Sequence, residues 1–426
     1  MKVFLDMVGC RLNQSELENY ARQFRMAGYS LVSTPELADM IVLNTCTVTA
    51  AAASDSRQKI RQAGRSGASQ VIVTGCWSSL HQAETAAFPG VTRVIGNLEK
   101  DDLVPTVLDL PAVDFTSRSR KREPIPGARQ RSRAFIKVQD GCDNHCTYCI
   151  TTLARGAGRS RKIAEVLADV RSAQQGGAKE AVLTGVHLGS WGDDFEPASS
   201  LVELIKVLLS ESEIPRIHLS SIEPWDISPD FFELWQDPRL CRHLHLPLQS
   251  GSLATLKRMG RKISPRAYAD LVQHARAAIP GVAITTDIIV GFPGETEKEF
   301  LESTAFIGEM AFTEAHIFTY SAMPGTAAAR LPGQIPLILA KQRNALLRQA
   351  VQKSSSQFLE AHLGQELMVL WEKATPLEAS RWQLSGLTDN YLRINAIYPA
   401  PCANQIMPVR VIGISQGKLT GEITQA

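Results

Sequence analysis

Short, mostly apolar runs alternate with amphipathic stretches in the first part of the chain. The runs at residues 3–8, 40–43 and 71–74 are each long enough for one strand. Apolar side chains on both faces of a strand are typical of a buried parallel sheet. Residues 14–27 and 51–63 are expected to be helices. The pattern therefore predicts an N-terminal α/β domain over residues 1–111.

A repeat of strand and helix begins at about residue 134. Repeated βα units favour a parallel (β/α) barrel, here a partial one of six strands. A long helix over residues 336–362 closes this domain, which we expect to span residues 134–362. The expected strands are residues 134–139, 181–186, 216–221, 243–249, 283–290 and 315–320. The expected helices between them include residues 163–175, 201–209, 265–278 and 297–309.

The pattern changes again after residue 362, where short apolar runs are separated by turn residues. Pro399 and Pro401 mark one such turn, and residues 413–417 another. Short strands with frequent turns predict a small antiparallel β-barrel over residues 363–426. Its expected strands are residues 366–371, 391–394, 409–414 and 418–422.

The composition is that of a globular chain, with 426 residues of which 44% are apolar and 21% are charged. This length suggests two or three domains. Asp6 and Arg11 interrupt any apolar core of a secretory signal, and Asp287 breaks the longest apolar stretch, so we expect a cytoplasmic protein without a membrane partner. Eight cysteines in such a chain point to metal binding or catalysis rather than disulfides.

Three cysteines, Cys142, Cys146 and Cys149, directly follow the first expected barrel strand, and we call them the loop cysteines. Three thiolates can hold three irons of a 4Fe–4S cluster and leave the fourth iron open, whereas a structural zinc takes four protein ligands. His145 could be the fourth ligand of a zinc site. The C-x3-C-x2-C pattern, with Tyr148 before the last cysteine, resembles the signature of radical S-adenosylmethionine (SAM) enzymes. The spacing therefore favours an open cluster.

A second set, Cys10, Cys46 and Cys76, follows the three strands expected in the N-terminal domain, and we call them the strand-end cysteines. Ligands of open α/β sheets bind outside the carboxyl ends of the strands, so these thiols could converge on one point. Buried cysteines at strand ends also behave as small hydrophobes. The spacing alone leaves both a second metal site and a structural role open.

Polar residues and glycines at the ends of the expected barrel strands could bind SAM. Glycine lets a ligand approach the backbone, and carboxylates or amides can bind amines and ribose hydroxyls. Loop and capping roles would explain each residue singly just as well. The candidates, together with Tyr148 of the cysteine loop, are Gly185, Ser221, Glu223, Gln249 and Asp287.

Two basic clusters flank the cysteine loop, although the whole chain balances 45 basic against 43 acidic residues. Residues 116–133 hold seven arginines or lysines and one acid. Clustered arginines attract phosphate backbones, which favours a nucleic-acid partner, and a solvated linker over residues 112–133 is the alternative. The second cluster consists of Arg155, Arg159, Arg161 and Lys162. The aromatic residues that could stack on RNA bases, or belong to the barrel core, are Trp371, Trp382 and Tyr391.

Together these motifs resemble the methylthiotransferase family of radical SAM enzymes over essentially the whole chain. The resemblance implies that the loop cysteines hold the 4Fe–4S cluster that binds SAM. It also implies a second 4Fe–4S cluster on the strand-end cysteines and a C-terminal RNA-binding barrel of the TRAM type. The motifs that carry it, besides the cysteine loop, are residues 9–16, 43–48, 74–76, 154–156, 159–161, 220–224, 245–251 and 287–295.

Within the family, residues 9–16 resemble the branch that modifies N6-threonylcarbamoyladenosine beside the anticodon of tRNA. The other branches act on isopentenyladenosine in tRNA or on an aspartate of a ribosomal protein. One departure is residues 150–153, where the family tends to have an Ile-Pro-Tyr-like segment. The resemblance implies a transferase that adds a methylthio group to carbon 2 of the adenine, with the tRNA anticodon loop, an electron donor and a sulfur donor as partners. A non-catalytic, metal-binding regulator that binds RNA is the alternative from another class.

Overall fold

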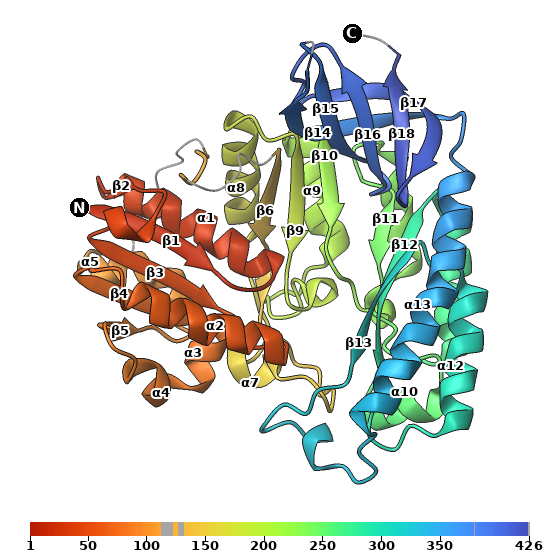
Figure 1. The fold of residues 1–426 in the computed structure, drawn as a ribbon, viewed down its shortest axis with the longest axis horizontal. Helices are drawn as coiled ribbons and strands as arrows, with labels where there is room; N and C mark the ends of the chain where they lie inside the picture. Colours follow the sequence, from red (N-terminus) through yellow and green to blue (C-terminus); the bar gives the residue numbers. More distant parts are fainter. Residues whose placement is uncertain (112–121, 127–131, 379, 425–426) are drawn as a thin grey trace.

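The N-terminal part of the molecule is a parallel sheet with helices packed on both faces (Figure 1). The computed structural model describes residues 1–111, 122–126, 132–378 and 380–424. The elements of this part are β1 (Lys2–Met7), α1 (Arg11–Met26), β2 (Ser30–Leu31), β3 (Met40–Thr45), α2 (Ala50–Ala63), β4 (Gln70–Gly75), α3 (Cys76–Leu80), α4 (Gln82–Ala86), β5 (Arg93–Val94) and α5 (Leu103–Leu108). The strand order is β2-β1-β3-β4-β5, and every neighbouring pair is parallel. The predicted α/β fold is confirmed; β2 and β5 were not predicted, because two residues carry no periodicity.

The central part is a partial barrel of parallel strands with helices outside it (Figure 1). Its elements are β6 (Arg133–Lys137), β7 (Gln139–Asp140), α7 (Thr151–Arg155), β8 (Arg159–Ser160), α8 (Ile163–Gln175), β9 (Glu180–Thr184), α9 (Leu201–Glu211), β10 (Arg216–Leu219), β11 (His243–His245), α10 (Leu253–Met259), α11 (Pro265–Ala278), β12 (Ala283–Val290), α12 (Glu297–Met310), β13 (Glu314–Thr319) and α13 (Leu337–Glu360). Strands β6, β9 and β10 form one sheet, and β11, β12 and β13 form another. The parallel bridges Ile217–Leu240 and Ser221–His245 join the two sheets, so the predicted six-strand partial barrel is confirmed. None of the helices in the described ranges is long and apolar enough to cross a membrane.

Strand β11 is shorter than the sequence predicts. The prediction runs over residues 243–249, whereas the strand ends at His245. Pro247 has no N–H to donate to a neighbouring strand, and Gln249 adopts a φ of +73°, outside the extended region. The N–H of Gln249 still donates to the carbonyl of Asp287 at 2.8 Å, which holds this loop against β12.

A closed β-barrel forms the C-terminal part and lies at the amino end of the central strands. Arg216, at the start of β10, donates to the carbonyls of Met368 and Leu387 in this barrel. The strand order around the barrel is β14-β15-β16-β18-β17. Its strands are β14 (Glu366–Pro376), β15 (Trp382–Thr388), β16 (Arg393–Tyr398), β17 (Ile406–Ser415) and β18 (Lys418–Ile423). The predicted small barrel is confirmed.

Two details of the C-terminal barrel correct the prediction. Strand β15 is absent from the predicted strands, because Ser385 and Gly386 interrupt its apolar pattern. A Cβ on Gly386 would lie 2.5 Å from the carbonyl oxygen of Leu370, so close strand packing requires glycine here. The barrel is also not wholly antiparallel, since β16 and β18 pair in parallel.

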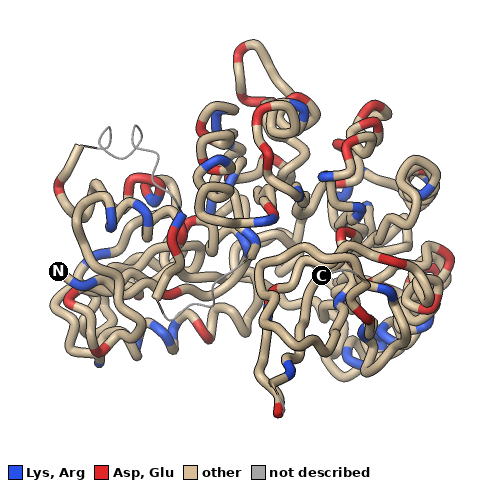
Figure 2. The backbone as a smooth tube through the Cα atoms, turned by 90° about the horizontal axis from the view of Figure 1, so that it is seen from above, with Lys and Arg blue, Asp and Glu red and all other residues tan. Residues whose placement is uncertain are grey.

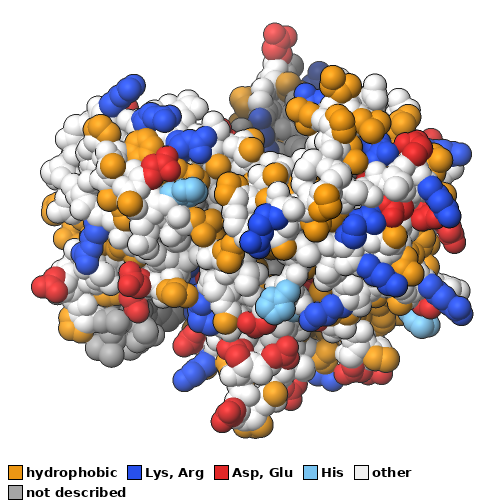
Figure 3. Space-filling view, turned by 90° about the horizontal axis from the view of Figure 1, so that it is seen from below, with side chains coloured by type: hydrophobic (Ala, Val, Ile, Leu, Met, Phe, Trp, Pro, Cys, Tyr) orange, Lys and Arg blue, Asp and Glu red, His pale blue; other side chains and the backbone are white. Residues whose placement is uncertain are grey.

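Most of the described basic residues near the cysteine loop form ion pairs within the protein. Arg122 pairs with Glu18 at 2.9 Å, and Arg161 pairs with Asp169 at 2.8 Å. Basic and acidic positions are interspersed both along the backbone (Figure 2) and over the face seen from below (Figure 3). Because these arginines are paired with carboxylates, they are less available to bind phosphate groups than the sequence predicts. Arg133 of the first cluster pairs with Glu372 at 2.7 Å. The other members of that cluster, Arg118, Arg120, Lys121, Arg129 and Arg131, lie outside the described residues.

A buried group of charges joins the N-terminal sheet to the central barrel. Nη1 of Arg155 lies 3.0 Å from Glu16 on α1 and 2.8 Å from Asp140 on β7. Nη2 of Arg155 donates to the side-chain oxygen of Asn13 at 2.7 Å. Lys100 bridges the same two carboxylates, at 2.5 Å from Glu16 and 2.9 Å from Asp140. Burial alone would raise the pKa of Glu16, but Lys100 and Arg155 lower it to about 2, so the group is fully ionised near neutral pH.

Replacing Arg155 by methionine is expected to lower the free energy of unfolding by about 3–5 kcal/mol, because it leaves buried carboxylates without their partner. The matched control is Arg22→Met, which removes a partly exposed ion pair between α1 and Asp169 at 2.6 Å, with side chains 25% and 18% exposed. That control should lower the free energy of unfolding by less than about 1 kcal/mol. Urea unfolding of both variants measures the difference, and equal losses would contradict the role given to Arg155.

Candidate functional site

The loop cysteines lie at the carboxyl end of the first barrel strand. The chain leaves β6, forms the short strand β7 and carries Cys142, Cys146 and Cys149 before α7 begins. All three are free and partly buried. The N–H of Asn144 points at the sulfur of Cys142, and the N–H of Thr151 at the sulfur of Cys149, both at 3.4 Å. Backbone donors aimed at sulfur suit thiolates that bind an iron–sulfur cluster.

A cation and aromatic rings surround this loop. Arg261 lies 3.9 Å from the sulfur of Cys146 and forms an ion pair with Glu223 at 2.6 Å. Burial raises the pKa of the Cys146 thiol, and the charge of Arg261 opposes that rise. Tyr148 makes an edge contact with Phe292, with 6.4 Å between ring centroids. Arg261 is therefore placed to offset negative charge on the loop.

The nearby histidines do not supply a fourth ligand for zinc within the described part of the chain. His145 is exposed. Nε2 of His187 lies 2.6 Å from Oδ2 of Asp226. Burial lowers the pKa of His187, but hydrogen bonds to Asp226 and Cys142 raise it to about 10. A protonated imidazole donates hydrogen bonds and has no lone pair for a metal, so His187 supports Cys142 as a donor.

The strand-end cysteines lie together at one edge of the N-terminal sheet. Cys10 precedes α1, Cys46 follows β3, and Cys76 begins α3 directly after β4. Gly9 has a φ of +114°, and a Cβ there would lie 2.6 Å from the Cβ of Cys46, so only glycine fits at this contact. Burial, with the neighbouring Cys10 and Cys76, raises the pKa of Cys46 to about 11. Three thiols this close could share one metal cluster.

Arg155 connects the two sets of cysteines. It is the last residue of α7, which follows the cysteine loop, and its Nε donates to the sulfur of Cys76 at 3.2 Å. Burial raises the pKa of Cys10, and the charge of Arg155 opposes that rise. Cys10 as a whole residue is nevertheless exposed to solvent.

Four of the residues predicted to bind SAM follow barrel strands at the end that carries the loop cysteines. Gly185 follows β9 and packs on Gln139, where a Cβ would lie 3.1 Å from the side-chain oxygen. Ser221 and Glu223 follow β10, and Gln249 follows β11. Their positions form a polar rim around the mouth of the barrel.

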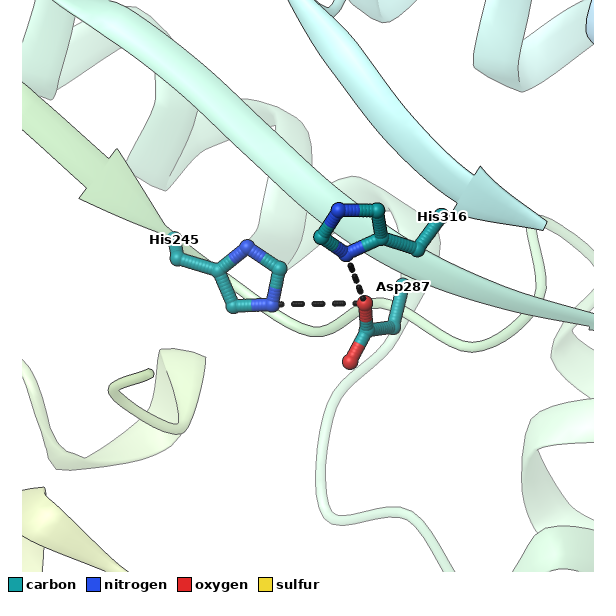
Figure 4. A group of neighbouring side chains, drawn as sticks. All are labelled: His245, Asp287 and His316. Carbon is teal, nitrogen blue, oxygen red and sulfur yellow. Dashed lines mark hydrogen bonds and ion pairs between the residues drawn. The ribbon is translucent and has the colours of Figure 1, made fainter. Parts of the chain in front are cut away.

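Asp287, which was also predicted to bind SAM, lies within β12 and contacts two histidines (Figure 4). Its Oδ1 is 3.4 Å from Nε2 of His245 and 3.1 Å from Nδ1 of His316. Burial raises the pKa of Asp287, but hydrogen bonds from both histidines hold it well below the usual range. Among the described residues, this is the one set of three ligand-type side chains whose ligand atoms all lie within 4.8 Å of one another. Sequence reasoning missed it, because its members come from three separate strands.

Histidines and a tyrosine close the opposite end of the barrel. Nε2 of His218 lies 2.8 Å from Nδ1 of His243, and both rings are buried. Burial lowers the pKa of both histidines, so they are neutral. Tyr391 of the C-terminal barrel stacks on them, with ring centroids 4.8 Å and 4.7 Å away. Tyr391 and the fully buried Trp371 are therefore packing residues rather than free stacking surfaces, and Trp382 packs against the barrel core.

Comparison with known proteins accounts for nearly the whole chain. Residues 2–96 match the model of Uncharacterized protein family UPF0004, and residues 136–307 match the Radical SAM superfamily. The threonylcarbamoyladenosine tRNA methylthiotransferase MtaB of Bacillus subtilis is 36% identical over 398 residues, covering 91% of this chain and 88% of that protein. The MtaB protein of Thermotoga maritima is also 36% identical, covering 92% and 90%. A tRNA-2-methylthio-N(6)-dimethylallyladenosine synthase of Trichlorobacter lovleyi is 32% identical over 99% of both chains.

Solved structures share the fold at much lower identity. TsrM of Kitasatospora setae, a radical SAM methyltransferase, superposes with a TM-score of 0.56 and 16% identity, covering 77% of this chain and 74% of that one. Such a likeness concerns the fold alone, whereas the relatives above match in sequence over 88–99% of their own length. The chain belongs to the radical SAM tRNA methylthiotransferase family, whose members are transferases that act on tRNA with SAM and a 4Fe–4S cluster.

Proposed function

We propose that this protein adds a methylthio group to carbon 2 of N6-threonylcarbamoyladenosine beside the anticodon of tRNA. The observation that carries the proposal is that relatives named for this substrate are 36% identical over more than 90% of the chain. The synthase acting on N(6)-dimethylallyladenosine, at 32% identity over 99% of the chain, makes that nucleoside the second candidate. The two candidates differ in the modified adenosine that is the substrate, and the methylthiolation reaction is the same.

The two sets of cysteines would each hold one 4Fe–4S cluster. The loop cysteines fit such a group, because they offer three thiols with backbone N–H donors to Cys142 and Cys149. The strand-end cysteines fit a second one, because adjacent parallel strands bring them together beside Arg155. Bound there, an open cluster would supply the electron that cleaves SAM, and a second cluster would supply the sulfur. Arg155 and Arg261 would offset thiolate charge at the two sites.

The residues around the barrel mouth would orient SAM. Tyr148, Gly185, Ser221, Glu223 and Gln249 would line the SAM site beside the loop cysteines, and glycine at Gly185 would let the ligand approach the backbone. Glu223 would have to serve SAM while paired with Arg261. Asp287 is engaged by His245 and His316, which argues for a role other than SAM binding.

The remaining proposals concern organisation and partners. We divide the chain into a methylthiotransferase domain at residues 1–111, a radical SAM domain at 134–362 and an RNA-binding barrel of the TRAM type at 363–426. The anticodon loop of tRNA, an electron donor and a sulfur donor would be the partners, acting in the cytoplasm where tRNA is modified.

Deleting the gene is expected to remove methylthiolated threonylcarbamoyladenosine from bulk tRNA, because under the proposal this protein is the enzyme that installs the sulfur on that nucleoside. Mass spectrometry of tRNA nucleosides measures the change. The unmethylthiolated precursor should accumulate, and a plasmid copy of the gene should restore the product. Loss of the isopentenyl derivative instead would overturn the substrate and favour the second candidate.

Single cysteine variants should separate the two cluster sites. Cys142→Ala is expected to abolish reductive cleavage of SAM, because it removes one of three thiolates from the open cluster. Cys46→Ala should retain cleavage and form no methylthiolated product. The matched control is Cys402→Ala, which changes a buried cysteine of the C-terminal barrel and should retain both activities. Deoxyadenosine and modified nucleosides are quantified after anaerobic reconstitution, and methylthiolated product from Cys46→Ala would refute the sulfur role.

A further inference from the structure

The inner face of β13 is exposed at the open edge of the partial barrel. Ala315 and Ile317 pack on the apolar core, whereas His316 and Phe318, which alternate with them, are exposed. The His316 side chain is 57% exposed, and its neighbours Asp287 and His245 are 26% and 12% exposed. The histidine–aspartate group is therefore anchored in the barrel and accessible from one side.

We propose that His245, Asp287 and His316 bind one divalent metal ion of the zinc or ferrous iron class. The three side chains point toward one another from β11, β12 and β13 (Figure 4). Tetrahedral ligation with bonds of about 2.0–2.2 Å places ligand atoms about 3.3 Å apart. The separations of 3.4 Å and 3.1 Å from Asp287 Oδ1 to the two ring nitrogens match this spacing. Two imidazoles and one carboxylate form a donor set that suits these metals.

A hydroxyl group behind the site fixes one of the ligands. Nδ1 of His245 lies 2.9 Å from the hydroxyl oxygen of Thr285, which is also 3.0 Å from Nε2 of His243. With an ion bound, Nδ1–H of His245 would donate to Thr285, and the lone pair of Nε2 would take the place of the proton that Nε2 shares with Asp287 in the metal-free protein. Histidines that ligate metals nearly always have their second ring nitrogen bonded in this way. Thr285 is therefore the expected supporting residue.

Three protein ligands with one accessible side leave coordination positions for an outside donor, as in catalytic rather than structural metal sites. The site uses none of the loop or strand-end cysteines, so it is separate from both proposed clusters. The donor class that fits is an oxygen ligand from substrate or water. Under the proposed function, on which this last step rests, the carboxylate of the threonylcarbamoyl group is such a donor.

Titration of the reconstituted protein with Mn²⁺, followed by the loss of the free-ion EPR signal, tests the site. Mn²⁺ prefers oxygen and nitrogen ligands to thiolates, and the cysteines are occupied in the reconstituted protein. One Mn²⁺ per chain is expected. His316→Gln should weaken binding by about a hundredfold or more, and Thr285→Val by about tenfold, because it removes only the supporting hydroxyl.

The matched control is His81→Gln, which breaks a surface histidine–carboxylate pair with Glu84 at 3.5 Å and should leave binding unchanged. Circular dichroism and iron content confirm that each variant is folded. Absence of both Mn²⁺ and Zn²⁺ binding by the wild type would overturn the site, since Mn²⁺ binds more weakly than the proposed metals. Equal binding by wild type and His316→Gln would also overturn it. Because the readout does not depend on which nucleoside is modified, failure here leaves the proposed function standing.

Discussion

The guanidinium of Arg155 is held by both halves of the molecule at once. It contacts Glu16 and Asn13 from α1, Asp140 from β7 and the sulfur of Cys76. A buried cation is tolerated only when nearly every donor has a partner, so each of these contacts constrains the others. The position of the N-terminal sheet against the barrel follows from this requirement. So does the position of the strand-end cysteines relative to the helix that follows the loop cysteines.

The geometry of parallel sheets explains why one arginine can contact both the N-terminal sheet and the partial barrel. In both the N-terminal sheet and the partial barrel, the reactive side chains follow the carboxyl ends of strands. Because Arg155 contacts both parts, the carboxyl ends of the strands in the N-terminal sheet and in the partial barrel face a common region. Arg155 therefore links the helix after the loop cysteines directly to Cys76 of the strand-end set.

Some of this could be predicted from sequence, because local spacing carries it. The C-x3-C-x2-C run fixes three thiols on one loop, and the rule for parallel strands correctly brings the strand-end cysteines to one edge. Other features depend on tertiary contacts that no local pattern reveals. Arg155 belongs to a basic cluster in sequence, yet it is buried in the fold. The His245, Asp287 and His316 group needs three strands in register, and Tyr391 is a packing residue only because the C-terminal barrel docks on His218 and His243.

The central claim is that Arg155 holds together two cysteine sets that each carry a 4Fe–4S cluster. Iron content and Mössbauer spectra of the anaerobically reconstituted protein test it most directly. The account predicts about eight irons per chain, all in clusters of the 4Fe–4S type. About four irons per chain, unchanged in a variant lacking all three strand-end cysteines, would contradict it.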